Sequence, residues 1–96
     1  MKILFTKIAE KKYRSIRNHI EAEWGEKVAF AFDQKTIDFL ELLKIFPEMG
    51  VKEVQEKQIR SFLLTHQTRI FYRIKQEHIV VLTFFDTRQH SNKRPK

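Results

Sequence analysis

The chain contains no cysteine and has only two glycines and two prolines among its 96 residues. Without cysteine it cannot form a disulfide framework or a thiolate metal site, so the fold must rest on packing alone, as is usual in a reducing compartment. No apolar run approaches the roughly 18 residues of a membrane helix, and the N-terminal MKILFTKIAEKK has too few apolar residues for a signal-peptide core. We therefore expect one cytoplasmic domain, residues 1–96, without membrane contact.

Patterns typical of metal and cofactor sites are also missing. The four histidines do not follow HxxH or HxxxH spacing, and no cluster of Asp or Glu accompanies them. The chain has no glycine-rich phosphate loop and no Ser-His-Asp or Cys-His arrangement. The sequence therefore predicts no metal site and no small-molecule cofactor.

The net positive charge lies in the second part of the chain. Residues 1–56 hold ten basic and ten acidic residues, whereas residues 57–96 hold nine basic residues against Glu77 and Asp86. The whole net charge of +7 thus belongs to residues 57–96. This asymmetry favours a polyanion or an acidic protein as partner, although many basic proteins are merely soluble.

The first half of the chain predicts a strand and two helices. Residues 2–6 form a short strand candidate, and Thr6 is suited to cap a helix. Apolar residues then recur at the helical period through 7–24 and 26–46, with Gly25 between the two segments and Pro47 after them. So short a link predicts an antiparallel helix hairpin. We assign an aromatic stripe on the second helix to the core: Phe32, Phe39 and Phe46.

The second half predicts a sheet. After the polar connector PEMGVKEVQE the apolar period changes to two residues, which predicts strands at 57–65, 68–75 and 78–85, followed by a basic tail at 86–96. The intervening HQ and QE are two-residue loops without the glycine that tight hairpins prefer. The expected fold class is α+β: a strand, an antiparallel helix hairpin, then a three-stranded antiparallel sheet.

Alternation along these strands sorts the side chains into two faces, if Thr65 pairs with Thr68 and Lys75 with His78. The face expected to lie on the helices holds Ile59, Ser61, Leu63, Ile70, Tyr72, Ile74, Ile79, Val81, Thr83 and Phe85. The face expected to remain open holds Arg60, Phe62, Leu64, Arg69, Phe71, Arg73, Val80, Leu82 and Phe84. Arginines among exposed aromatics are typical of surfaces that bind phosphates and bases, or an acidic amphipathic partner, although such arginines also form ordinary surface ion pairs.

With this order of elements and the segments FPEMG, IRSF, TRIFYRI and IVVLTFFDTRQH, the chain resembles the RelE/ParE toxins of bacterial type II toxin-antitoxin systems. The resemblance implies a fold similar to small microbial ribonucleases and a cognate antitoxin that wraps the toxin. It also implies one of two targets. RelE-like members cut mRNA in the ribosome with a cluster of basic residues, whereas ParE-like members poison DNA gyrase without known catalysis.

Only part of the catalytic set of RelE-like enzymes has a counterpart in this sequence. Arg69 matches the strand arginine aimed at the scissile phosphate, and Arg60 matches a basic residue on the preceding strand. Phe62 stands where those enzymes have a second lysine, and their C-terminal tyrosine has no counterpart. Arg88 is a candidate for the terminal arginine, and His90 for the general acid or base.

We therefore interpret the chain as a toxin, with the ParE-like gyrase poison favoured because the catalytic set is broken. A ribosome-dependent mRNA endoribonuclease and a non-toxic RNA-binding module remain the alternatives. If the chain is a ribonuclease, the catalytic candidates are Arg60, Arg69, Arg88 and His90. The residues expected to bind the target or the antitoxin are Arg60, Phe62, Arg69, Phe71, Arg73, Phe84, Arg88, His90, Lys93 and Arg94.

Overall fold

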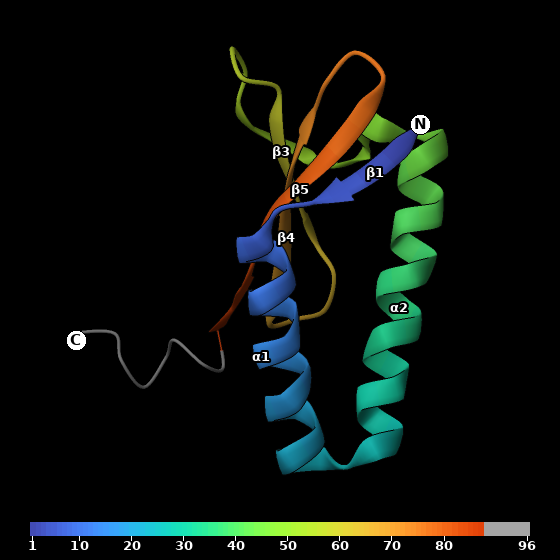
Figure 1. Ribbon diagram of the computed structural model, residues 1–96, viewed down its shortest axis with the longest axis vertical. Helices are drawn as coiled ribbons and strands as arrows, with labels where there is room; N and C mark the ends of the chain where they lie inside the picture. Colours follow the sequence, from blue (N-terminus) through green and yellow to red (C-terminus); the bar gives the residue numbers. More distant parts are fainter. Residues whose placement is uncertain (88–96) are drawn as a thin grey trace, which may run out of the picture.

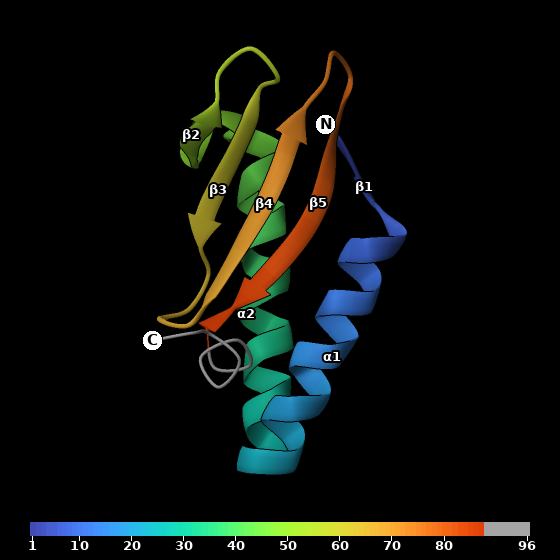
Figure 2. The ribbon, with the colours of Figure 1, turned by 90° about the vertical axis from the view of Figure 1, so that its left-hand side faces the viewer.

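The computed structural model describes residues 1–87 and places two helices against one face of a five-stranded sheet (Figures 1 and 2). The elements in chain order are β1 (Lys2–Phe5), α1 (Lys7–Trp24), α2 (Glu26–Ile45), the 3-10 turn η1 (Pro47–Met49), β2 (Val51–Val54), β3 (Ile59–Leu63), β4 (Thr68–Ile74) and β5 (His78–Asp86). Neither helix of the described range combines the length and apolar character that a bilayer span requires.

The predicted helix hairpin is present, and its ends follow from local chemistry. The side chain of Thr6 caps α1 by accepting a hydrogen bond from the Ala9 N–H at 2.9 Å. Gly25 separates the helices with φ of 97°, a backbone conformation that favours glycine. Phe32 and Phe39 are buried as predicted, whereas Phe46 lies past the last turn of α2 and is 58% exposed. The core assignment of Phe46 was therefore wrong.

The sheet is larger than the predicted three-stranded antiparallel sheet. Its strand order is β1-β5-β4-β3-β2, and β1 runs parallel to β5 while all other neighbours are antiparallel. The prediction missed this arrangement because β1 pairs with the strand most distant in sequence, through a crossover that contains both helices.

The connector after α2 also contains a strand that the sequence analysis did not assign. β2 pairs with β3, with Val51 opposite Ser61 and Val54 opposite Ile59. Its four residues include Lys52 and Glu53 and are all exposed, so the apolar alternation that predicts strands is weak here. The predicted strand 57–65 is correspondingly shorter, because Gln58 adopts a left-handed φ of 56° in the turn that joins β2 to β3.

The register of β3 differs from the prediction by one residue, which exchanges its two faces. Leu63 pairs with Arg69, because the N–H groups of Leu64 and Thr65 both bond the Thr68 carbonyl and the Thr65 hydroxyl accepts the Thr68 N–H at 3.1 Å. This side-chain-stabilised turn is wider than the two-residue loop that we expected. The face exchange places Arg60, Phe62 and Leu64 on the helix side and Ile59, Ser61 and Leu63 on the open side.

A similar shift occurs in β5. The predicted pairing holds from Ile74 opposite Ile79 to Tyr72 opposite Val81, but Phe71 then pairs with Thr83, so Leu82 is an extra residue in the strand. Thr6 donates a hydrogen bond to the Leu82 carbonyl at 2.8 Å, which ties the start of α1 to this bulge. Beyond the bulge, Phe84 turns into the core, where it is 1% exposed, and the predicted open position of Phe84 was wrong.

Aromatic contacts join the helices to the sheet. Phe39 of α2 stacks on Phe62 of β3 with 4.4 Å between ring centroids. Tyr13 of α1 contacts both Phe32 and Phe84, each at 5.3 Å. The helix hairpin therefore covers one face of the sheet, and within residues 1–87 no helix lies on the opposite face (Figure 2).

Candidate target-binding face

The open face of the sheet carries the candidate site. We call it the outer face and define it by the residues that register places on it: Ile59, Ser61, Leu63, Arg69, Phe71, Arg73, Val80, Thr83 and Phe85. Arg69, Phe71 and Arg73 alternate along β4 as predicted, and each is partly exposed. Leu63 at the edge of this face is 48% exposed. The outer face thus offers cations and apolar side chains together, which suits an amphipathic acidic partner or a polyanion.

Arg69 belongs to a small polar cluster that extends to the edge strand. Its Nη1 donates to the Ser61 hydroxyl at 2.9 Å, and that hydroxyl donates in turn to a carboxylate oxygen of Glu53 on β2. The chain of bonds fixes a guanidinium and a carboxylate on one surface. A cation and a proton acceptor placed in this way could hold a phosphate and accept a proton from a nearby hydroxyl.

Glu53 was not among the predicted site residues. Residues 51–56 read as a polar connector, and only the pairing of β2 with β3 brings Glu53 next to Ser61. Ser61 was assigned to the helix-facing side because of the one-residue error in register. No signal in the sequence alone links these two residues.

Arg60 lies on the helix-facing side and not on the outer face. It is only 8% exposed, and its Nη1 donates to the carbonyls of Glu48 at 3.0 Å and Gly50 at 2.7 Å. Its Nε is buried and has no partner among the described residues. Arg60 therefore holds the turn that follows α2, and its predicted place on the open face was wrong.

Tyr72, which pairs with Arg60, holds the same turn. Its hydroxyl donates to the Pro47 carbonyl at 2.8 Å and accepts the Gly50 N–H at 2.9 Å. Burial raises the pKa of Tyr72, and the Gly50 N–H and the nearby Arg60 only partly oppose this. The phenol is therefore a structural hydrogen-bonding group and is protonated at neutral pH.

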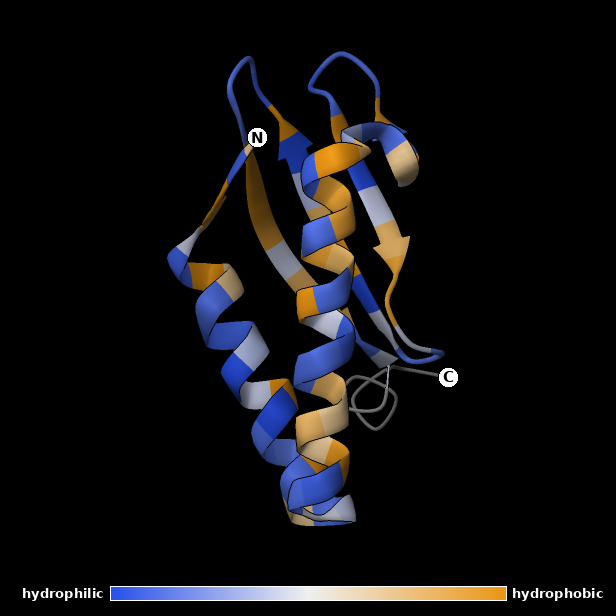
Figure 3. Cartoon of the chain, turned by 90° about the vertical axis from the view of Figure 1, so that its right-hand side faces the viewer, coloured by the Kyte–Doolittle hydropathy of each residue, from blue (hydrophilic) through white to orange (hydrophobic). Residues whose placement is uncertain are grey.

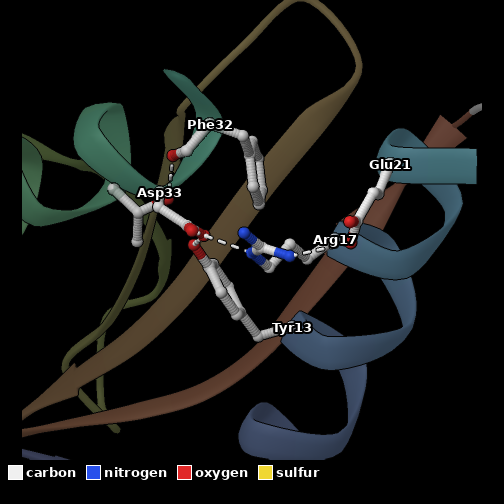
Figure 4. A network of polar contacts seen from close by, with 6 residues as sticks. Tyr13, Arg17, Glu21, Phe32 and Asp33 are labelled. Atoms are coloured by element: carbon white, nitrogen blue, oxygen red, sulfur yellow. Dashed lines mark hydrogen bonds and ion pairs between the residues drawn. The ribbon is translucent and has the colours of Figure 1, made fainter. Parts of the chain in front are cut away.

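A second polar cluster joins the two helices (Figure 4). The Asp33 carboxylate accepts hydrogen bonds from the Tyr13 hydroxyl at 2.5 Å and from Arg17 Nε at 2.8 Å, and Arg17 also pairs with Glu21 at 3.1 Å. Burial raises the pKa of Tyr13, and the hydrogen bond to Asp33 adds to the effect. All these groups have partners within the cluster, so we interpret it as a clamp between α1 and α2.

Comparison with known proteins identifies the family. Residues 3–90 match the sequence model described as the ParE toxin of type II toxin-antitoxin system, parDE. The chain belongs to the ParE toxin family.

Two solved structures share the fold of this ParE-type toxin. The chromosomal ParDE toxin-antitoxin system from P. aeruginosa aligns with a TM-score of 0.73 at 20% identity, over 90% of this chain and 95% of that chain. A YoeB/ParE toxin from Agrobacterium tumefaciens aligns with a TM-score of 0.64 at 17% identity, over 90% and 98%. No curated protein matches the sequence.

The predicted site residues of the toxin thus separate into three groups. Arg69, Phe71 and Arg73 lie together on the outer face. Arg60, Phe62 and Phe84 are on the helix-facing side, where Phe62 stacks on Phe39 and Phe84 is buried, so the predicted placement of these three on the open face was wrong. The remaining candidates lie outside the described residues: Arg88, His90, Lys93 and Arg94. Within residues 1–87, no group of three or more His, Cys, Asp or Glu side chains is arranged to hold a metal ion.

Proposed function

We propose that this ParE-type toxin arrests growth when it is free of a cognate antitoxin, and that it does so by binding DNA gyrase without catalysis of its own. The observation that carries the proposal is the position of Arg60. Its guanidinium is buried and bonded to two backbone carbonyls, so it is not available to a substrate phosphate.

Cleavage of a phosphodiester by its 2′-hydroxyl requires a proton acceptor, cations for the phosphorane and a proton donor for the leaving oxygen. On the outer face, the arginines within residues 1–87 are Arg69 and Arg73. The tyrosines of the same range, Tyr13 and Tyr72, are bonded to Asp33 and to the turn after α2. An arrangement with so few free catalytic groups favours a surface that acts through binding.

The ribonuclease is the second candidate, and one observation favours it. The Glu53 carboxylate and the Arg69 guanidinium share the Ser61 hydroxyl, and this places an acid-base group beside a cation. In such an enzyme Glu53 would accept the proton of the 2′-hydroxyl, and Arg69 would stabilise the phosphorane charge.

We further propose that the antitoxin covers the outer face with an amphipathic acidic segment. Phe71, Leu63 and Val80 would contact its apolar side, and Arg69 and Arg73 its acidic side. The proposed antitoxin and either proposed target imply that the toxin acts in the cytoplasm.

The test is induced expression of the toxin, followed by mapping of gyrase-linked DNA breaks in the arrested cells and of cut mRNA in a translating extract. The gyrase proposal predicts arrest with gyrase-linked breaks and intact mRNA, and co-expressed antitoxin should restore growth. Codon-phased mRNA cuts without gyrase-linked breaks would establish the ribonuclease, and no arrest would contradict both.

A further inference from the structure

A cleft of about 790 Å³ opens at the end of the sheet, between the β2–β3 turn and the β4–β5 turn. Figure 3 shows that both turns are hydrophilic and project side by side beyond the sheet. The cationic residues that line the cleft are Lys57, Arg73 and Lys75, joined by His78. Glu56 and Glu77 line it as well.

Backbone hydrogen bonds hold the two walls of this cleft in place. The Gln58 N–H bonds the Gln55 carbonyl at 3.1 Å, and the Lys75 N–H bonds the His78 carbonyl at 2.9 Å, so each turn is closed. The Ile74 N–H also bonds the Gln58 carbonyl at 3.0 Å, which links one turn to the other. The cleft is therefore built before any ligand arrives, and its cations lose little backbone freedom on binding.

Within residues 1–87, the three cations of the cleft form no ion pair with Glu56, with Glu77 or with any other carboxylate. Within residues 1–87 the ion pairs all lie on the helices, joining Arg17 to Glu21 and Asp33 and Lys44 to Glu41. Lys57 follows Glu56 directly and Lys75 lies near Glu77, yet neither lysine is within ion-pair distance of a carboxylate in this range. Their charges remain available to an anion from solution.

The cleft is continuous with the outer face. Arg73 belongs to both, and Arg69 and Phe71 precede it at alternate positions of β4. Lys2 on β1 is opposite His78 in the sheet register and adds a cation at the same end. A line of positive charge, with an aromatic side chain within it, thus runs along β4 and ends between the two turns.

We propose that this cleft binds the sugar-phosphate backbone of a polynucleotide, with Lys57, Arg73 and Lys75 contacting phosphates. A phosphate backbone suits the cleft better than an acidic peptide does, because both turns are hydrophilic (Figure 3) and, of the residues within 1–87 that line the cleft, only Ile74 is apolar, which gives the anchor residue of a peptide little to pack against. The inference goes beyond the proposed function, since that function gives no role to Lys57 or Lys75 and shares only Arg73 with this cleft.

The test is fluorescence anisotropy of the purified full chain with a labelled oligothymidylate over a range of salt concentrations. Lys57→Gln combined with Lys75→Gln should weaken binding by about 10-fold at low salt and reduce the slope of log affinity against log salt by about 1 to 2. Glu56→Gln combined with Glu77→Gln should strengthen binding, since it removes the acids of the same cleft. Lys11→Gln combined with Lys27→Gln removes two exposed helix charges and is the matched control.

The proposal requires that replacing the two cleft lysines weakens binding more than replacing the two helix lysines does. Both variants have the same net charge, and their thermal melting should be unchanged. If both double variants lost the same affinity for the oligonucleotide, the effect would be one of net charge alone and the proposal would be overturned. A wild-type chain that does not bind the oligonucleotide would overturn it too. Tighter binding of a labelled polyglutamate peptide than of the oligonucleotide would also overturn it. None of these assays contains gyrase, so their failure leaves the proposed function untouched.

Discussion

Arg60 and Tyr72 stand opposite each other on β3 and β4 and hold the same four-residue turn, Pro47 to Gly50. Arg60 bonds the Glu48 and Gly50 carbonyls, and Tyr72 bonds the Pro47 carbonyl and the Gly50 N–H. The segment FPEMG, which contributed to the resemblance to toxins, is thus fixed by two strand residues far along the chain. Its conformation sets where β2 begins and so where Glu53 lies.

Replacing Arg60 should destabilise the fold. Arg60→Met leaves the two carbonyls without their charged donor, and we expect a loss of about 2 to 3 kcal/mol in the free energy of unfolding. Arg73→Met, at a partly exposed site without an ion pair in the described range, should cost less than about 0.5 kcal/mol. Urea unfolding of both variants measures the difference. Equal stability of the two variants would contradict a structural role for Arg60.

Gly50 should tolerate no side chain. A Cβ at this position would stand 2.6 Å from the Tyr72 hydroxyl oxygen and 2.7 Å from the Ser61 carbonyl oxygen. We expect Gly50→Ala to cost about 1 to 3 kcal/mol, as overpacking does. In a Tyr72→Phe background part of the clash is absent, so the added cost of Gly50→Ala should be smaller. A double-mutant cycle measured by urea unfolding checks this, and strictly additive effects would rule out the contact.

The two phenylalanines Phe84 and Phe71 should behave in opposite ways. Phe84→Ala empties a core position that is 1% exposed, and we expect a loss of about 3 to 5 kcal/mol. Phe71→Ala on the outer face should cost less stability and instead weaken binding of the antitoxin. Thermal melting and antitoxin titration of each variant separate the effects. Normal antitoxin affinity in Phe71→Ala would remove Phe71 from the interface.

Residues on a single strand were easier to place from sequence than residues on facing strands. Arg69, Phe71 and Arg73 were placed correctly relative to one another because alternation along β4 needs no knowledge of its neighbours. Arg60 and Phe62 were misplaced because the face of β3 depends on the turn before β4, where the Thr65 hydroxyl bonds the Gln67 and Thr68 N–H groups and shifts the register. The bulge at Leu82 misplaced Phe84 in the same way.

The positions of the two edge strands, β1 and β2, were harder still to predict from the sequence. β1 gains its place only by pairing with β5, the strand furthest from it in sequence, and β2 is an exposed and charged strand. Neither feature has a local signal in the sequence. The helices, in contrast, follow from apolar period, the cap at Thr6 and the glycine between them, all of which are local.

Alkaline pH should weaken the clamp between the helices. Because burial and Asp33 raise the pKa of Tyr13 above its ordinary value of 10.0, the folded state favours the protonated phenol. Stability from this group is complete below that ordinary pKa and decreases as the pH rises above it. Tyr13→Phe should therefore show a shallower loss of stability above pH 10 than the wild type, measured by urea unfolding at several pH values. If the free energy of unfolding depended on pH in the same way in Tyr13→Phe and in the wild type, ionisation of Tyr13 would not contribute to the loss of stability.

The cluster of Glu53, Ser61 and Arg69 gives the sharpest separation of the two toxin mechanisms. If the chain is a ribonuclease, Glu53→Gln keeps the shape of the side chain but removes the proton acceptor, and mRNA cleavage should decrease by about 100-fold or more. If it is a gyrase poison, the same change alters only a contact near Arg69, and gyrase-linked breaks should persist with at most a modest change in the dose required. Ser61→Ala is the matched control, because it breaks the bonds to Glu53 and Arg69 without removing either charge. Growth arrest, cut mRNA and gyrase-linked DNA breaks are measured for the wild type, Glu53→Gln and Ser61→Ala. Gyrase-linked breaks that persist in Glu53→Gln support the gyrase proposal. Loss of both growth arrest and mRNA cleavage in Glu53→Gln overturns it.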